Sequence, residues 1–74
     1  MAPLPAVSGR QAVAAFERAG FEVRRQRGSH IILTKAGVAA TLSVPDHRRL
    51  RTGTLRALIR KAGLTPDGFV ALLG

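Results

Sequence analysis

The sequence of 74 residues contains no cysteine, tryptophan or tyrosine, and only four of its residues are acidic. Without cysteine no disulfide can form and nothing indicates an oxidising compartment, so we expect the protein in the cytoplasm. No stretch approaches the roughly 20 apolar residues of a membrane span, so no membrane partner is predicted. Residues 1–7 lack the pattern of a signal peptide and are expected to be a flexible segment of a single domain, residues 1–74.

The charge of the chain is strongly one-sided, because twelve Lys and Arg residues against four acidic ones give a net charge of +8. Such a surplus favours a polyanionic partner, and nucleic acid is the leading candidate, although charge can also serve solubility alone. Two arginine clusters each flank one histidine: Arg24, Arg25 and Arg27 beside His30, and Arg48, Arg49 and Arg51 beside His47. All three aromatic residues are phenylalanines, so a platform for stacking single-stranded bases is not predicted.

Local signals predict three helices. Ser8 and Gln11 have the spacing of a capping box, which predicts a helix over residues 8–20. A second helix follows a polar, arginine-rich loop, with Thr52 or Thr54 as its cap. A short third helix is expected near the C-terminus.

Between the first two helices the apolar period changes to two, which predicts three strands. Phe21 and Val23 point to one side of a half-buried first strand. After a turn at residues 27–29, residues 30–35 should return as the second strand of an antiparallel hairpin, and residues 40–44 should add the third. The predicted fold is α+β, with the order α-β-β-β-α of the double-stranded-RNA-binding fold, both main helices on one sheet face and the short third helix at the end.

Six short motifs resemble, in this order, those of HicA-type toxins: Ser8-Gly9-Arg10, Ala19-Gly20-Phe21, Arg27-Gly28-Ser29-His30, Val44-Pro45-Asp46-His47, Gly53-Thr54-Leu55 and Ala62-Gly63-Leu64-Thr65. The resemblance covers nearly the whole chain. It implies the double-stranded-RNA-binding fold, cleavage of mRNA without a metal ion, and neutralisation by a HicB-type antitoxin that occludes the active site. It also implies that His30, in the Gly-Ser-His motif, is the catalytic residue. Many members carry a second histidine next, where this chain has Ile31.

The residue types fit that chemistry. Metal-free RNA cleavage needs a base for the 2′-hydroxyl proton, an acid for the leaving oxygen, and positive charge near the phosphorus. Histidine suits both proton steps because its unperturbed pKa is about 6.5, and arginine matches phosphate oxygens. The two histidines and scattered acids show no metal-ligand spacing, so neither metal nor cofactor is predicted. Besides the catalytic His30, the residues predicted to bind RNA are Arg25, Arg27, Gly28, Ser29, Lys35, His47, Arg48, Arg49, Arg51, Thr54 and Arg56.

Several of these residues also have a purely structural interpretation. His30 can be a satisfied histidine at a strand start, and His47 can cap a loop, with Asp46 as its acceptor. Strand parity places Arg25 on the side of Val23, where it can snorkel from the edge of the core. For the whole protein the alternatives are a non-catalytic double-stranded-RNA-binding module and a small adaptor that docks a protein on its sheet.

Overall fold

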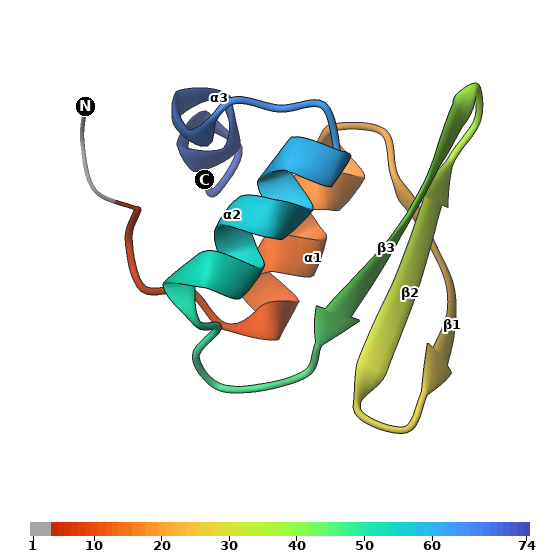
Figure 1. The fold of residues 1–74 in the computed structure, drawn as a ribbon, viewed down its shortest axis with the longest axis horizontal. Coiled ribbons are helices and arrows are strands. Elements are labelled where there is room, and N and C mark those ends of the chain that lie inside the picture. The colour runs from red at the N-terminus through yellow and green to blue at the C-terminus, as the bar shows by residue number, and fades with distance from the viewer. Residues whose placement is uncertain (1–3) are drawn as a thin grey trace.

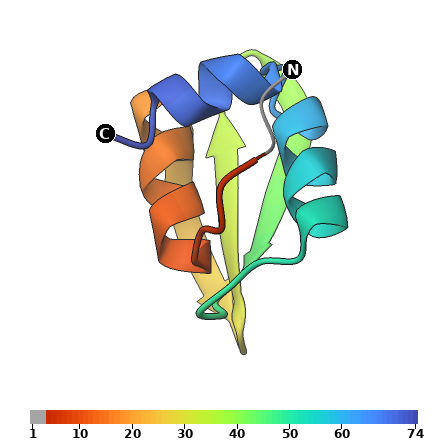
Figure 2. The ribbon, with the colours of Figure 1, turned by 90° about the vertical axis from the view of Figure 1, so that its left-hand side faces the viewer.

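The computed structural model describes residues 4–74 as three helices and one three-stranded sheet (Figure 1). The elements in chain order are α1 (Gly9–Arg18), β1 (Glu22–Arg27), β2 (His30–Lys35), β3 (Val38–Pro45), α2 (Thr52–Lys61) and α3 (Pro66–Ala71). β2 is the central strand and pairs antiparallel with both neighbours. α1 and α2 cover one face of the sheet, and α3 crosses over one end of both helices (Figure 2). The predicted fold class is confirmed.

Local signals at the ends of α1 act as predicted. The Ser8 hydroxyl accepts a hydrogen bond from the Gln11 backbone N–H at 3.0 Å, and the Gln11 side chain accepts one from the Ser8 backbone N–H at 2.8 Å. The helix ends before Gly20, whose φ of +101° lies in a region that other residues rarely adopt. α1 is therefore specified by its own sequence at both ends.

The start of α2 differs from the prediction, because neither threonine caps this helix. Its N-cap is Arg51, which makes no side-chain capping bond, and Thr52 is already the first helical residue. The preceding residue, Leu50, is buried, and its N–H donates to the carbonyl oxygen of Val7 at 2.8 Å. This tertiary anchor, which no local pattern indicates, fixes where the chain turns into the helix.

The core lies between the helices and the sheet and contains no buried polar or charged residue among those described. Its largest fully buried side chains are Phe16, Phe69, Leu33, Leu42, Leu55, Ile59 and Val44. The ring of Phe16 lies 6.2 Å from that of Phe21 and 5.2 Å from that of Phe69, measured between centroids. Phe16 therefore ties α1 to the entry of the sheet and to α3.

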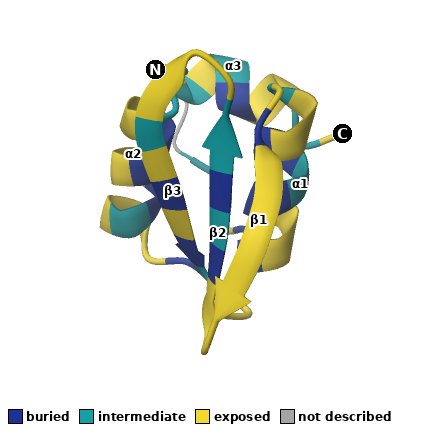
Figure 3. Ribbon diagram, turned by 90° about the vertical axis from the view of Figure 1, so that its right-hand side faces the viewer, coloured by how far each residue is buried: buried dark blue, intermediate teal, exposed yellow. Residues whose placement is uncertain are grey.

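β1 is not the half-buried strand that the alternation predicts, because all six of its residues are exposed (Figure 3). A β-bulge lies between Val23 and Arg25: Val23 is opposite Leu33, whereas Arg25 is opposite Ile32. Since Leu33 and Ile32 are consecutive, they point to opposite faces, and so do the residues paired with them. The expected position of Arg25 at the edge of the core is therefore wrong, and Arg25 lies on the face away from the helices.

The N-terminal segment packs on the domain where it is described. Residues 1–3 of the expected flexible segment lie outside the described residues. Leu4 packs against the core and Val7 is buried within it. Two of the four described residues of this segment are therefore held against the core, whereas Pro5 and Ala6 are exposed.

Gly9, at the start of α1, lies so close to the end of β3 that even a small substitution there should lower the stability of the fold. A Cβ atom at Gly9 would collide with the backbone carbonyl of Pro45, whereas one at Gly53 would meet nothing within 4 Å. We expect Gly9→Ala to lower the free energy of unfolding by about 1–3 kcal/mol because the backbone must shift. Gly53→Ala should be neutral or stabilising by up to about 1 kcal/mol. Urea unfolding followed by circular dichroism measures both, and equal effects would contradict the close contact.

Candidate active site

His30 is the first residue of β2 and directly follows the two-residue turn Gly28–Ser29. Gly28, but not Ser29, has a positive φ, of +57°, which is the sign pattern of a type II′ hairpin turn. The residues that follow alternate: Ile31 is buried against the helices, and Ile32 is not. His30 therefore shares the open face of the sheet with Ile32, and it is exposed to solvent.

Cross-strand pairing surrounds His30 with a small set of neighbours. Arg27 lies directly opposite His30 on β1, and Arg25 lies two pairs further along, opposite Ile32. On β3, Ser43 is also opposite Ile32, and its Oγ lies 3.3 Å from Nδ1 of His30. Because paired residues share a face, these five residues form one surface, termed here the open-face site. The bulge in β1 is what adds Arg25 to it.

The turn before His30 lies against the loop after β3, at the same end of the sheet (Figure 1). The N–H of Asp46 donates to the carbonyl oxygen of Ser29 at 2.7 Å, and the N–H of Gly9 donates to that of His47 at 2.9 Å. The first bond holds the Gly-Ser-His and Pro-Asp-His segments side by side, and the second joins the loop to the start of α1. The second arginine cluster lies exposed in the same loop: Arg48, Arg49 and Arg51.

The carboxylate of Asp46 is bound by Arg10 rather than by His47. Nε and Nη2 of Arg10 lie 3.1 and 3.0 Å from Oδ1 and Oδ2 of Asp46. The hydrogen bond from Arg10 lowers the pKa of Asp46 from its usual value, and the same bond raises the pKa of Arg10. The pair joins the start of α1 to the loop after β3, so the interpretation of Asp46 as the acceptor for His47 is wrong.

In the described part of the chain, the arginines around His30 and His47 have no acidic partners. Among residues 4–74 the one ion pair is that of Arg10 with Asp46. Guanidinium groups without a carboxylate partner are available to phosphate oxygens, which match their planar donor geometry. The end of the sheet that contains His30 is therefore suited to bind a polyanion.

Two other kinds of site are not formed by the part of the chain that the structure describes. No group of three or more His, Asp or Glu residues there is placed to hold a metal ion. None of the three helices is long and apolar enough to cross a membrane.

Lys35, a predicted RNA-binding residue, lies at the other end of β2 from His30. Its ammonium group donates to the carbonyl oxygen of Ala19 at 2.8 Å and lies 5.7 Å from the centroid of the Phe21 ring. A cation bound to a carbonyl after the last turn of α1 complements the helix dipole. The structure thus uses Lys35 to join α1 to the sheet and does not bring it to the open-face site.

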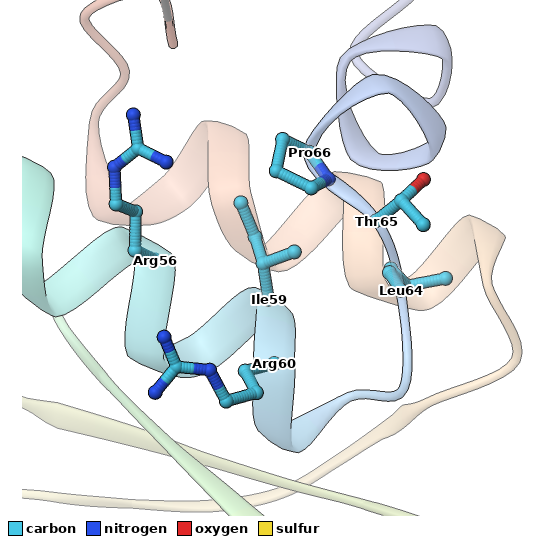
Figure 4. A pocket seen from close by; sticks show the side chains of 6 residues that line it. All are labelled: Arg56, Ile59, Arg60, Leu64, Thr65 and Pro66. Atoms are coloured by element: carbon cyan, nitrogen blue, oxygen red, sulfur yellow. The ribbon is translucent and has the colours of Figure 1, made fainter.

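Arg56 also lies apart from His30, on the helical side of the molecule. Together with other residues of α2 and of the segment leading to α3 it lines a shallow depression of about 230 Å³ (Figure 4). Its lining residues are Arg56, Ile59, Arg60, Leu64, Thr65 and Pro66. Thr54, by contrast, is half-buried in the first turn of α2 and follows the basic loop directly.

Ser43 is the residue of the site that sequence reasoning missed. The buried positions of Leu42 and Val44 on either side of Ser43 already indicate that it faces away from the core. Its approach to His30, however, depends on the register between β2 and β3. Because that register is determined by the pairing of the whole sheet, no sequence motif around Ser43 predicts its contact with His30.

The family model described as HicA toxin of bacterial toxin-antitoxin matches residues 9–64. The matched region includes α1, all three strands, α2 and both histidines, and it ends before α3. A search of curated proteins found no match.

The ion pair between Arg10 and Asp46 predicts an acid-sensitive contribution to stability. The pKa of Asp46 is lower in the folded protein than in the unfolded chain, so the contribution is present above the unfolded pKa of about 3.9 and is lost as the pH falls through the folded pKa. We expect Asp46→Asn to reduce the loss of stability between about pH 5 and about pH 2.5. Urea unfolding at both pH values measures this loss. Glu17→Gln, at an exposed position of α1, should leave it unchanged, and an equal effect of both variants would contradict the role of the pair.

Proposed function

The chain belongs to the HicA family of toxins from bacterial toxin–antitoxin systems, and from this premise we propose that it is a metal-independent endoribonuclease that cleaves mRNA through His30. The observation that supports this most is the placement of an exposed histidine on the open face, directly opposite Arg27 and on the same face as Arg25. Such a surface joins a proton-transfer group to fixed positive charges. Those are the groups that metal-free RNA cleavage requires.

The proposed reaction is an attack by the 2′-hydroxyl oxygen on the neighbouring phosphorus. His30 accepts the hydroxyl proton as the new O–P bond forms; the P–O5′ bond then breaks, and protonated His30 donates that proton to the leaving 5′-oxygen. The products are a 2′,3′-cyclic phosphate and a 5′-hydroxyl end. Nδ1 of His30 faces Ser43, and no other residue described in the structure hydrogen-bonds to the ring, so Nε2 is the nitrogen available to RNA.

Arg27 and Arg25 supply the charge for this reaction. As the 2′-oxygen attacks, negative charge grows on the oxygens around the phosphorus. A guanidinium group stays charged at any working pH and can donate two parallel hydrogen bonds to such oxygens. Arg27 is next to the histidine across the strand pair, so we assign it to the phosphate at the cleaved linkage and Arg25 to a neighbouring phosphate.

The RNA backbone is proposed to continue from the open-face site over the turn towards the basic loop. Gly28 and Ser29 present an exposed turn on this path, and Ser29 is joined to Asp46 of the loop by a backbone hydrogen bond. The remaining contacts are assigned to the loop and the start of α2: His47, Arg48, Arg49, Arg51 and Thr54. Lys35 and Arg56 are not on this path.

Membership of a toxin–antitoxin family implies an antitoxin partner. We propose that this partner is of the HicB type and covers the open-face site in the cytoplasm, so that it competes with mRNA for the same arginines. Half-buried Ile32 in the centre of the site offers an apolar contact, and acidic side chains of the partner would match the surrounding charge.

Replacing His30 by Ala tests the proposed catalysis. We expect the cleavage rate to fall by about 10²- to 10⁴-fold, because proton transfer is lost, while the affinity for RNA stays nearly unchanged. The measurement is single-turnover cleavage of a labelled RNA in the presence of EDTA. The same RNA with a 2′-deoxy linkage at the cleaved position should resist the wild-type protein.

Tight binding by the wild-type protein without cleavage would contradict the enzyme proposal and favour a non-catalytic RNA-binding module. Cleavage at the deoxy linkage would contradict attack by the 2′-hydroxyl.

Replacing Arg27 by Ala tests the proposed phosphate contact separately from catalysis. In the His30→Ala background, where RNA stays intact, we expect the negative slope of log affinity against log salt to become shallower by about 0.7, the value for one phosphate contact on a single strand. Arg60→Ala removes the same charge from the helical side and should change the slope much less. Salt titrations of a fluorescent RNA measure both slopes, and equal changes would show that only total charge matters.

A further inference from the structure

Ser43 is the one side chain among those described that hydrogen-bonds to the ring of His30, with 3.3 Å between Oγ and Nδ1. We propose that Ser43 is a positioning residue: its hydroxyl accepts a hydrogen bond from Nδ1–H of His30 and keeps Nε2 directed at the RNA during both proton transfers. This inference rests on the proposed function of His30 in RNA cleavage.

The position of Ser43 follows from the pairing of β2 with β3. His30 is opposite Pro45, and Ser43 is opposite Ile32, so Ser43 and His30 are diagonal neighbours on the open face. Ser43 lies near the end of β3, between Leu42 and Val44, whose side chains are fully buried. Its backbone is thus held by the sheet and by the core, although its side chain is exposed.

The chemistry of the ring determines the direction of this hydrogen bond. To act as a base through Nε2, neutral His30 must carry its proton on Nδ1. To act as an acid afterwards, the charged ring carries protons on both nitrogens. Nδ1 is therefore a donor in both reacting states, and it needs an acceptor in both. A serine hydroxyl rotates freely and has lone pairs to accept such a bond.

Without an acceptor at Nδ1, the neutral ring in water favours the other tautomer, with the proton on Nε2. In that form the lone pair lies at Nδ1, away from the RNA, and the ring cannot take the 2′-hydroxyl proton through Nε2. Ser43 therefore increases the share of His30 that is ready to react. Because the separation is at the long end of the range for N–H···O bonds and the pair is exposed, the effect should be several-fold rather than complete.

The tautomer of His30 can be observed without any RNA. In the full-length protein labelled with ¹⁵N-histidine, above the histidine titration range, we expect a larger Nδ1–H fraction for His30 than for His47. His47 serves as the internal reference because no hydrogen bond to its ring is found among the described residues. This excess should disappear in Ser43→Ala and persist in Ser43→Thr, which keeps the hydroxyl.

Thr41→Ala is the matched control for this experiment. Thr41 lies on the same strand and the same face as Ser43 and is exposed, but among the described residues it makes no hydrogen bond to His30. Its replacement should leave the His30 spectrum unchanged. A His30 spectrum that is the same in the wild-type protein and in Ser43→Ala would overturn the proposed hydrogen bond.

The kinetic consequence is measured by single-turnover cleavage at saturating RNA. We expect Ser43→Ala to lower the rate about three- to tenfold, with unchanged RNA affinity, and Ser43→Thr to restore it. An active wild-type protein with an equally active Ser43→Ala variant would overturn the role of Ser43 and leave the proposed function intact. A wild-type protein that does not cleave would overturn the proposed function and, with it, the role of Ser43, whatever the tautomer.

Discussion

The register of β2 against its two neighbours is the constraint on which the rest of the structure depends. Ile31 and Leu33 on this strand fill the core, and His30 and Ile32 alternate with them along the strand and lie on the opposite face. Because side chains alternate along a strand, a slip of one residue would place His30 in the core and the aliphatic residues in water. The apolar contacts that stabilise the fold therefore also hold the histidine at the surface.

The residues that stabilise the fold are different from those proposed to act on RNA. The described core is entirely apolar, and the charged residues stay outside it. The segments around the site are instead held by backbone hydrogen bonds, from Asp46 to Ser29 and from Gly9 to His47. Since these bonds use main-chain atoms, the exposed side chains at this end of the sheet remain free to meet a ligand, and their replacement should affect binding more than folding.

How much the sequence predicts depends on whether the signal is local. The capping box of α1, the bounds of β2 and the order of the elements are confirmed because each has a short-range pattern. The predicted face of Arg25 is wrong because the β-bulge in β1 depends on the pairing with β2. The alternation of apolar and polar residues in the sequence does not show where such a bulge lies. The contact between Ser43 and His30 likewise depends on the register between strands. The sequence motif therefore identifies His30 as the catalytic candidate, but it does not identify the residues that lie beside His30 in the sheet.

The exposure of the open-face site has consequences for both catalysis and inhibition. Charges that act through water are weaker than charges in a closed cavity, so the proposed reaction depends on several arginines around one histidine rather than on exclusion of solvent. The same exposure makes the surface easy for a protein to cover. Covering it, however, removes water from unpaired guanidinium groups, which is costly unless carboxylates replace the water. An antitoxin that neutralises this chain at the open-face site therefore has to imitate the charge of RNA as well as block access to His30.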